Sequence, residues 1–112
     1  MKETIDKKVI PWINMINSYS GIETVSSCGG HKKPKDIDQV PENEFYVSFR
    51  FIDGKFNAEG WSSISDIMNY ITECEFNDDE SLKIELNMHL LTEVFFTLKG
   101  KNVNYEDLYG VQ

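Results

Sequence analysis

Apolar residues recur with two different periods along this chain, and each period predicts a different kind of element. Steps of three and four residues, the spacing of an amphipathic helix, connect Ile5, Val9, Trp12, Ile13, Ile16 and Tyr19. Gly21 is available to end this helix. Because Pro11 lies inside the pattern, we expect the helix to bend there, and the alternative is a short turn before a helix that begins at Pro11.

A second helix is predicted after the turn at Asp53-Gly54. Ser63, with Asp66 three residues later, resembles a capping box that opens it. Its apolar stripe consists of Ile64, Ile67, Met68, Ile71 and Cys74.

Four segments are predicted to be strands. The segment from Ile22 to Cys28 is rich in Thr, Val and Ser and ends at Gly29-Gly30. The segments at 45–51, 82–89 and 94–98 alternate apolar and polar residues, which indicates strands packed on one side, and Gly100 is expected to close the last of them.

The order helix, strand, strand, helix, strand, strand predicts an α+β fold of two layers, with a mostly antiparallel four-stranded sheet and both helices on one face. The face expected beneath the helices carries Phe45, Val47, Phe49, Leu82, Ile84, Leu86 and Phe96. The opposite, open face would carry Tyr46, Ser48, Arg50, Glu85, Asn87, His89, Phe95 and Thr97. Such a face can remain solvated or bind a partner.

Composition narrows the classes of function. The length of 112 residues suits one domain over residues 1–112. A net charge of −8 argues against a nucleic-acid partner and favours a basic protein partner. With two cysteines, no apolar leader and no apolar run of roughly 18 residues, we expect a cytoplasmic protein without a membrane role.

The most distinctive string runs from Ser26 to Lys35 and opens a long loop. Adjacent glycines allow backbone N–H groups to converge on an anion, and lysines follow at once, against the negative charge of the whole chain. The residues predicted to bind an anionic ligand are Ser26, Ser27, Gly29, Gly30, Lys32, Lys33 and Arg50.

Cys28 and His31 are the candidate catalytic pair, because nearby lysines and an imidazole would lower the thiol pKa. The alternative is that Cys28 is a small buried apolar residue at a strand end, and whether the protein is an enzyme stays open. A zinc site would have to gather Cys28, His31, His89 and Cys74. Since only the first two are close in sequence, no metal site is predicted.

The first half of the chain resembles the tRNA wybutosine-synthesizing methyltransferase family, which methylates an intermediate of a tricyclic guanosine derivative next to the phenylalanine anticodon. The likeness lies in Ile13-Asn14-Met15-Ile16-Asn17, in Glu23-Thr24-Val25-Ser26-Ser27-Cys28-Gly29-Gly30 and in the strand at Phe45. The family string reads Ser-Ser-Cys-Ser-Gly-Arg, so Gly29 replaces a serine and His31 an arginine. The Ser-Cys-x-Gly-His string also resembles small bacterial or phage-type proteins of unassigned activity. The family resemblance implies S-adenosylmethionine as a ligand.

Three functional hypotheses follow. The first is recognition of a small anionic molecule, a nucleotide or S-adenosylmethionine, by the loop beside Arg50. The second is an acidic interaction or inhibitor module that docks on a basic protein, and the third is a tRNA-modification methyltransferase-like protein. A homodimer that pairs strand edges, or that covers Phe95 and Tyr46, is a further alternative.

Overall fold

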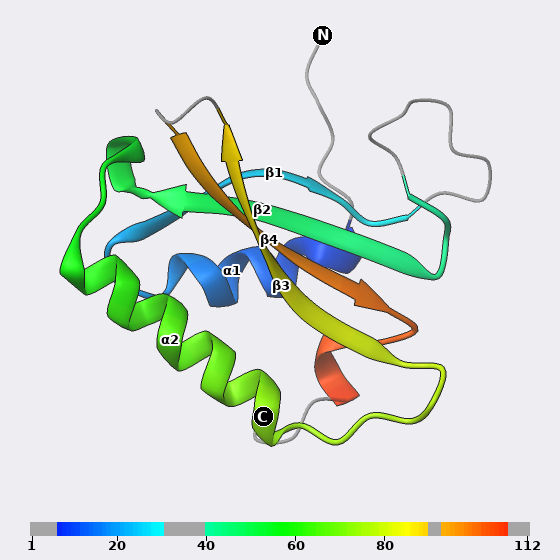
Figure 1. Cartoon of the computed structure of the whole chain (residues 1–112). Coiled ribbons are helices and arrows are strands. Elements are labelled where there is room, and N and C mark those ends of the chain that lie inside the picture. Colours follow the sequence, from blue (N-terminus) through cyan, green and yellow to red (C-terminus); the bar gives the residue numbers. More distant parts are fainter. Residues whose placement is uncertain (1–6, 31–39, 90–92, 108–112) are drawn as a thin grey trace, which may run out of the picture.

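The computed structural model describes residues 7–30, 40–89 and 93–107 of the chain (Figure 1). Its helices are a 3-10 turn at Lys7–Val9, α1 at Ile10–Asn17, a 3-10 turn at Ile52–Gly54, α2 at Ala58–Glu73 and a last 3-10 turn at Tyr105–Asp107. Its strands are β1 at Ile22–Cys28, β2 at Glu44–Phe51, β3 at Ser81–His89 and β4 at Glu93–Lys101.

The predicted α+β fold is confirmed. The strands form one antiparallel sheet in the order β1-β2-β4-β3, so β1 and β3 are the two edges. Both helices lie on the same side of this sheet (Figure 1). Side chains from α1, α2 and the facing side of the sheet form one hydrophobic core. The other side is the open face.

One part of the core lies where α1 meets β2. Trp12 is completely buried and stacks on Phe45, with ring centroids 4.7 Å apart. A Cβ at Gly100 would collide with the ring of Phe45, so β4 needs a glycine at this position. The prediction that Gly100 closes the fourth strand is therefore wrong, because Gly100 lies within β4 and makes room for the aromatic ring.

The expected bend of the first helix at Pro11 is also wrong. A 3-10 turn comes first, and α1 begins at Ile10 with Pro11 in its first turn. A proline is tolerated there because the N–H groups of the first turn have no partner within the helix. The alternative of a short turn before the helix describes the chain, with the helix starting one residue earlier than Pro11.

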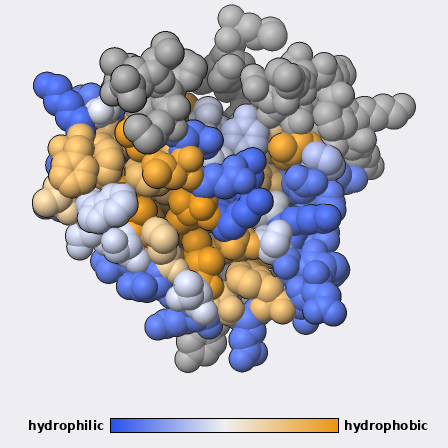
Figure 2. All heavy atoms as spheres, in the orientation of Figure 1, coloured by the Kyte–Doolittle hydropathy of each residue, from blue (hydrophilic) through white to orange (hydrophobic). Residues whose placement is uncertain are grey.

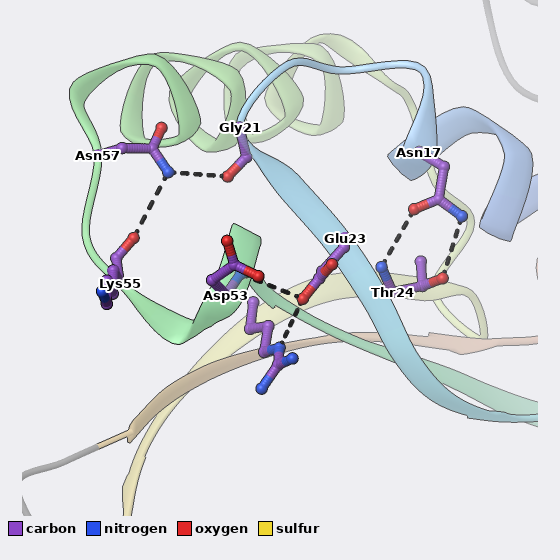
Figure 3. Close-up of polar contacts among 8 residues, drawn as sticks. Asn17, Gly21, Glu23, Thr24, Asp53, Lys55 and Asn57 are labelled. Atoms are coloured by element: carbon purple, nitrogen blue, oxygen red, sulfur yellow. Dashed lines mark hydrogen bonds and ion pairs between the residues drawn. The ribbon is translucent and has the colours of Figure 1, made fainter.

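The second helix begins five residues before the predicted Ser63. Asn57 caps it, since its Oδ1 accepts a hydrogen bond of 2.6 Å from the Gly60 N–H. The Asn57 Nδ2 donates to the Gly21 carbonyl at 3.1 Å (Figure 3). The Ser63 hydroxyl is buried and donates to the Ser20 carbonyl at 2.6 Å. The capping-box interpretation is wrong because this serine joins α2 to the turn before β1.

Strand β1 contains a bulge between Thr24 and Ser26. Thr24 pairs with Phe49 on the core side, whereas Ser26 pairs with Ser48 and Cys28 with Tyr46 on the open face. The extra residue, Val25, changes the direction of every later side chain in the strand. This explains why apolar and polar residues do not alternate regularly along β1.

Candidate functional site

The described part of the predicted anion loop is divided between the two faces of the sheet. Ser26 and Cys28 lie on the open face, whereas Ser27 pairs with Val47 and is directed toward the core side. Cys28 is buried, with 5% of its surface exposed. Burial agrees with the alternative in which this cysteine is a small apolar residue at a strand end.

Gly30 has the positive φ expected at a sharp turn, +95°. A Cβ at Gly30 would lie 2.6 to 2.8 Å from the carbonyl oxygens of Glu44, Pro41 and Glu42. The glycine is thus required by close approach of the segment that leads into β2. His31, Lys32, Lys33 and Lys35 lie outside the described residues. An anion site formed with these residues stays a prediction.

Arg50 lies on the same face of the sheet as Ser26 and Cys28. Cys28 pairs with Tyr46, and Arg50 lies four residues farther along β2, which is about 13 Å at the usual rise per residue. The Arg50 Nε donates to Glu23 Oε2 at 2.8 Å. The same carboxylate oxygen accepts the Asp53 N–H at 3.4 Å (Figure 3). Glu23 therefore connects Arg50 to the turn after β2. The place of Arg50 beside the loop stays a prediction, because residues 31–39 lie outside the described residues.

The two cysteines are also separated. Cys28 is on the open face, whereas Cys74 packs against the core on the other side of the sheet, where its thiol donates to the Tyr70 carbonyl at 3.4 Å. Neither of these two cysteines forms a disulfide. Among the described residues, no group of three or more His, Cys, Asp or Glu side chains could hold a metal ion.

Polar side chains form a hydrogen-bonded network in the middle of the open face. Thr97 is buried there, and its hydroxyl is 3.2 Å from the Ser48 hydroxyl and accepts from Asn87 Nδ2 at 3.4 Å. Glu85 contacts Lys99 at 2.8 Å and Lys83 at 3.3 Å. Hydrogen bonds from Lys99 and then Lys83 lower the pKa of Glu85 below its ordinary value.

Two tyrosines near the helices have raised pKa values. Burial is the main cause at both, and it raises the pKa of Tyr70 to about 12. Nearby Asp66 adds to the increase at Tyr19. Both phenols are therefore protonated near neutral pH, which does not suit them to act as general bases there.

One surface feature that sequence reasoning missed is apolar. We call it the α2–β3 patch and define it as the exposed side chains Phe56, Trp61, Met68 and Leu86. Their exposed fractions are 69%, 49%, 49% and 57%, respectively. Figure 2 shows hydrophobic residues gathered at the surface between α2 and β3.

Aromatic contacts join the patch to the core beneath it. The Trp61 ring lies 6.4 Å from that of Phe96, and the Phe56 ring lies 5.3 Å from that of Phe51. Phe96 and Phe51 are both buried. The exposed rings therefore extend outward from the core, so that apolar surface is continuous from the interior to solvent.

The patch exists because α2 does not cover the far part of β3. Ile64 and Ile67 face the core, and Met68 lies on the flank of the helix with Trp61, seven residues or about two turns earlier. Leu86, which pairs with core residue Phe96, is on the predicted face. The expectation that helices cover it is wrong, because more than half of its side chain is exposed.

The patch lies in the most acidic part of the chain. Between Lys55 and Lys83 the sequence has no basic residue. Its acidic residues there are Glu59, Asp66, Glu73, Glu75, Asp78, Asp79 and Glu80. This acidic stretch was the only feature of the sequence that pointed to the patch. The pattern of apolar residues places Met68 and Leu86 among the core residues, and Trp61 comes before the predicted start of the helix.

Comparison of the chain with protein-family models, with curated proteins and with solved structures finds no match in any of the three. Within the described ranges, no helix has both the length and the apolar character needed to cross a membrane.

Proposed function

We propose that this protein is an interaction module whose α2–β3 patch binds a basic amphipathic helix of a partner protein. The observation that carries the proposal is the grouping of four large apolar side chains at the surface beside α2, three of them about half exposed and Phe56 more so. Contiguous exposed apolar groups of this kind mark docking sites in many proteins.

The chemistry of the patch suits a helix as the occupant. Trp61 and Met68 are two turns apart on one flank of α2, and Leu86 lies across from them on β3. A helix with apolar residues at steps of three, four and seven positions can place successive side chains along such a surface. Trp61 is the expected energetic centre, because tryptophan is enriched among the residues that dominate binding energy.

The charge of the surrounding segment favours lysine and arginine on the partner. Seven acidic residues and no basic one lie between Lys55 and Lys83. Opposite charges speed association and fix orientation, so association should slow as salt rises.

This proposal is preferred to recognition of a small anion by the Ser26–Lys35 loop. Arg50, one of the predicted anion ligands, is engaged by Glu23. Carbonyl oxygens approach Gly30, and these would repel an anion. S-adenosylmethionine and the methyltransferase-like activity rest on the family resemblance alone.

The test uses a fluorescein-labelled synthetic helix of about 14 leucine and lysine residues, with leucine at positions i, i+3, i+4 and i+7. Fluorescence anisotropy measures its Kd for the full chain. Two further peptides serve as probes of mechanism: one replaces lysine with glutamate, and one replaces leucine with serine. We expect the leucine–lysine peptide to bind and both others to bind at least about tenfold more weakly.

Variants locate the site. Met68→Ser combined with Leu86→Ser should raise the Kd of the leucine–lysine peptide about tenfold or more. The matched control is Val25→Ser, which changes a side chain of 43% exposure on the opposite edge strand and should leave the Kd unchanged. Circular dichroism checks that each variant is folded. An unchanged Kd in a folded double variant, or equal binding of the glutamate peptide, would refute the proposal.

A further inference from the structure

The two edges of the sheet are treated differently by the fold. At the β1 edge, the side chain of Asn17 in α1 makes two hydrogen bonds to Thr24. Its Oδ1 accepts from the Thr24 backbone N–H at 3.1 Å, and its Nδ2 donates to the Thr24 hydroxyl at 3.0 Å (Figure 3). The bulge at Val25 also disrupts this edge. Both devices prevent another strand from pairing with β1.

The β3 edge has neither device. Its register with β4 is unbroken from Ser81 to His89. Two side-chain contacts of β3, from Asn87 to Thr97 and from Glu85 to Lys99, run to β4. A long, regular edge with unpaired backbone groups is a template for another strand.

The sequence of β3 complements itself. Around Ile84 it reads Leu82-Lys83-Ile84-Glu85-Leu86. In an antiparallel pair of two such strands centred on Ile84, each Lys83 lies opposite Glu85 of the second copy, and each Leu82 lies opposite Leu86. Lys83 and Glu85 are on the open face, and the leucines are on the helix side. Each cross-strand pair from Leu82 to Leu86 is thus favourable in charge or in apolar character.

We propose that two copies of this chain pair through their β3 strands, in antiparallel register centred on Ile84, to form one continuous eight-stranded sheet. Leu86 is 57% exposed on the helix side of β3, and the strand of the second copy would cover part of it. A two-fold axis perpendicular to the sheet keeps both α2 helices on the same face. The α2–β3 patches of the two copies then join into one apolar surface.

This inference does not depend on the proposed peptide binding, because it rests on the β3 edge and its charge pattern. Light scattering coupled to gel filtration measures the mass of the full chain over a range of concentrations. We expect a dimer for the natural sequence. Lys83→Glu places two carboxylates opposite each other across the strand pair, and Glu85→Lys places two lysines opposite each other, so each should weaken dimerisation by about tenfold or more.

The decisive variant exchanges both charges. Lys83→Glu combined with Glu85→Lys restores opposite charges across the two-fold axis and should restore the dimer. Lys7→Glu, an exposed charge reversal outside the sheet, is the matched control for net charge and should remain dimeric. A monomeric natural protein at every concentration, single variants that stay fully dimeric, or a double exchange that stays monomeric would each overturn the proposal. A dimer that does not bind the leucine–lysine peptide would contradict only the proposed function.

Discussion

The β1–β2 half and the β3–β4 half of the sheet differ in how completely the fold covers them. In the first half, Trp12 and Phe45 are fully buried against each other, and Asn17 covers the edge strand. In the second half, α2 leaves Leu86 more than half exposed, and the edge is regular. We therefore expect the first half to contribute more to stability, and the second half to carry the surface that we propose for partner binding.

The largest expected effect tests that division directly. Trp12→Ala should lower the free energy of unfolding by about 3–5 kcal/mol, because it removes a fully buried ring and leaves a cavity. Leu86→Ala should change it by no more than about 0.5 kcal/mol in the monomer, since its side chain is largely in solvent. Urea denaturation at low protein concentration measures both.

A more conservative substitution at Trp12 tests the same prediction for the free energy of unfolding. Among the described residues, the Trp12 Nε1 is buried without a hydrogen-bond partner. Trp12→Phe keeps a ring and removes this unpaired donor, so it should cost only about 1 kcal/mol. A Leu86→Ala cost as large as that of Trp12→Ala would contradict the division into a stabilising half and a docking half.

The second effect concerns the covered edge. Asn17→Ala removes two hydrogen bonds to Thr24 and should lower the free energy of unfolding by about 1 kcal/mol. Hydrogen exchange of the Thr24 amide should become faster. Asn14→Ala, at an exposed site on the same helix, is the control and should not change this exchange rate. An unchanged Thr24 rate in Asn17→Ala would mean that this side chain does not protect the edge.

The smallest effect is electrostatic and lies on β3. Lys99 and Lys83 lower the pKa of Glu85, so its stabilising contribution is present above the ordinary value of 4.5 and is lost as pH falls through the lower folded-state pKa. Glu85→Gln should therefore flatten the decline of stability below pH 4.5, by a few tenths of a kcal/mol because the side chain is partly exposed and solvent screens its charge.

Acid titration of unfolding in dilute, monomeric protein measures this slope. Glu59→Gln changes an exposed carboxylate on α2 and serves as the control. Identical slopes for Glu85→Gln and the natural protein would show that the contacts of Glu85 with the two lysines add nothing to stability.

Much of the fold could be predicted because it depends on local periodicity. The alternation of Phe45, Val47, Phe49 and Phe51 specifies both the strand β2 and its buried face. The start of α2 could not be predicted in the same way. It depends on Asn57 and Gly60 contacting the turn at Gly21, which is distant in sequence, so that no local pattern marks it.

The candidate site was predicted less well for a related reason. A pattern of apolar residues indicates which side chains share a face, but it does not tell how much of that face a helix covers. Met68 and Leu86 therefore read as core residues, although both are about half exposed. Arg50 read as a free cation, because its partner Glu23 comes from a neighbouring strand.

The extra residue at Val25 reverses the face of the sheet to which each later residue of β1 points. Before the bulge, the even-numbered residues Ile22 and Thr24 are on the helix side of the sheet. After it, the even-numbered residues Ser26 and Cys28 are on the open face. Cys28 therefore lies on the open face with Tyr46, whereas Cys74 packs against the core on the other side of the sheet. One inserted residue thus keeps the sulfur atoms of Cys28 and Cys74 on opposite sides of the sheet.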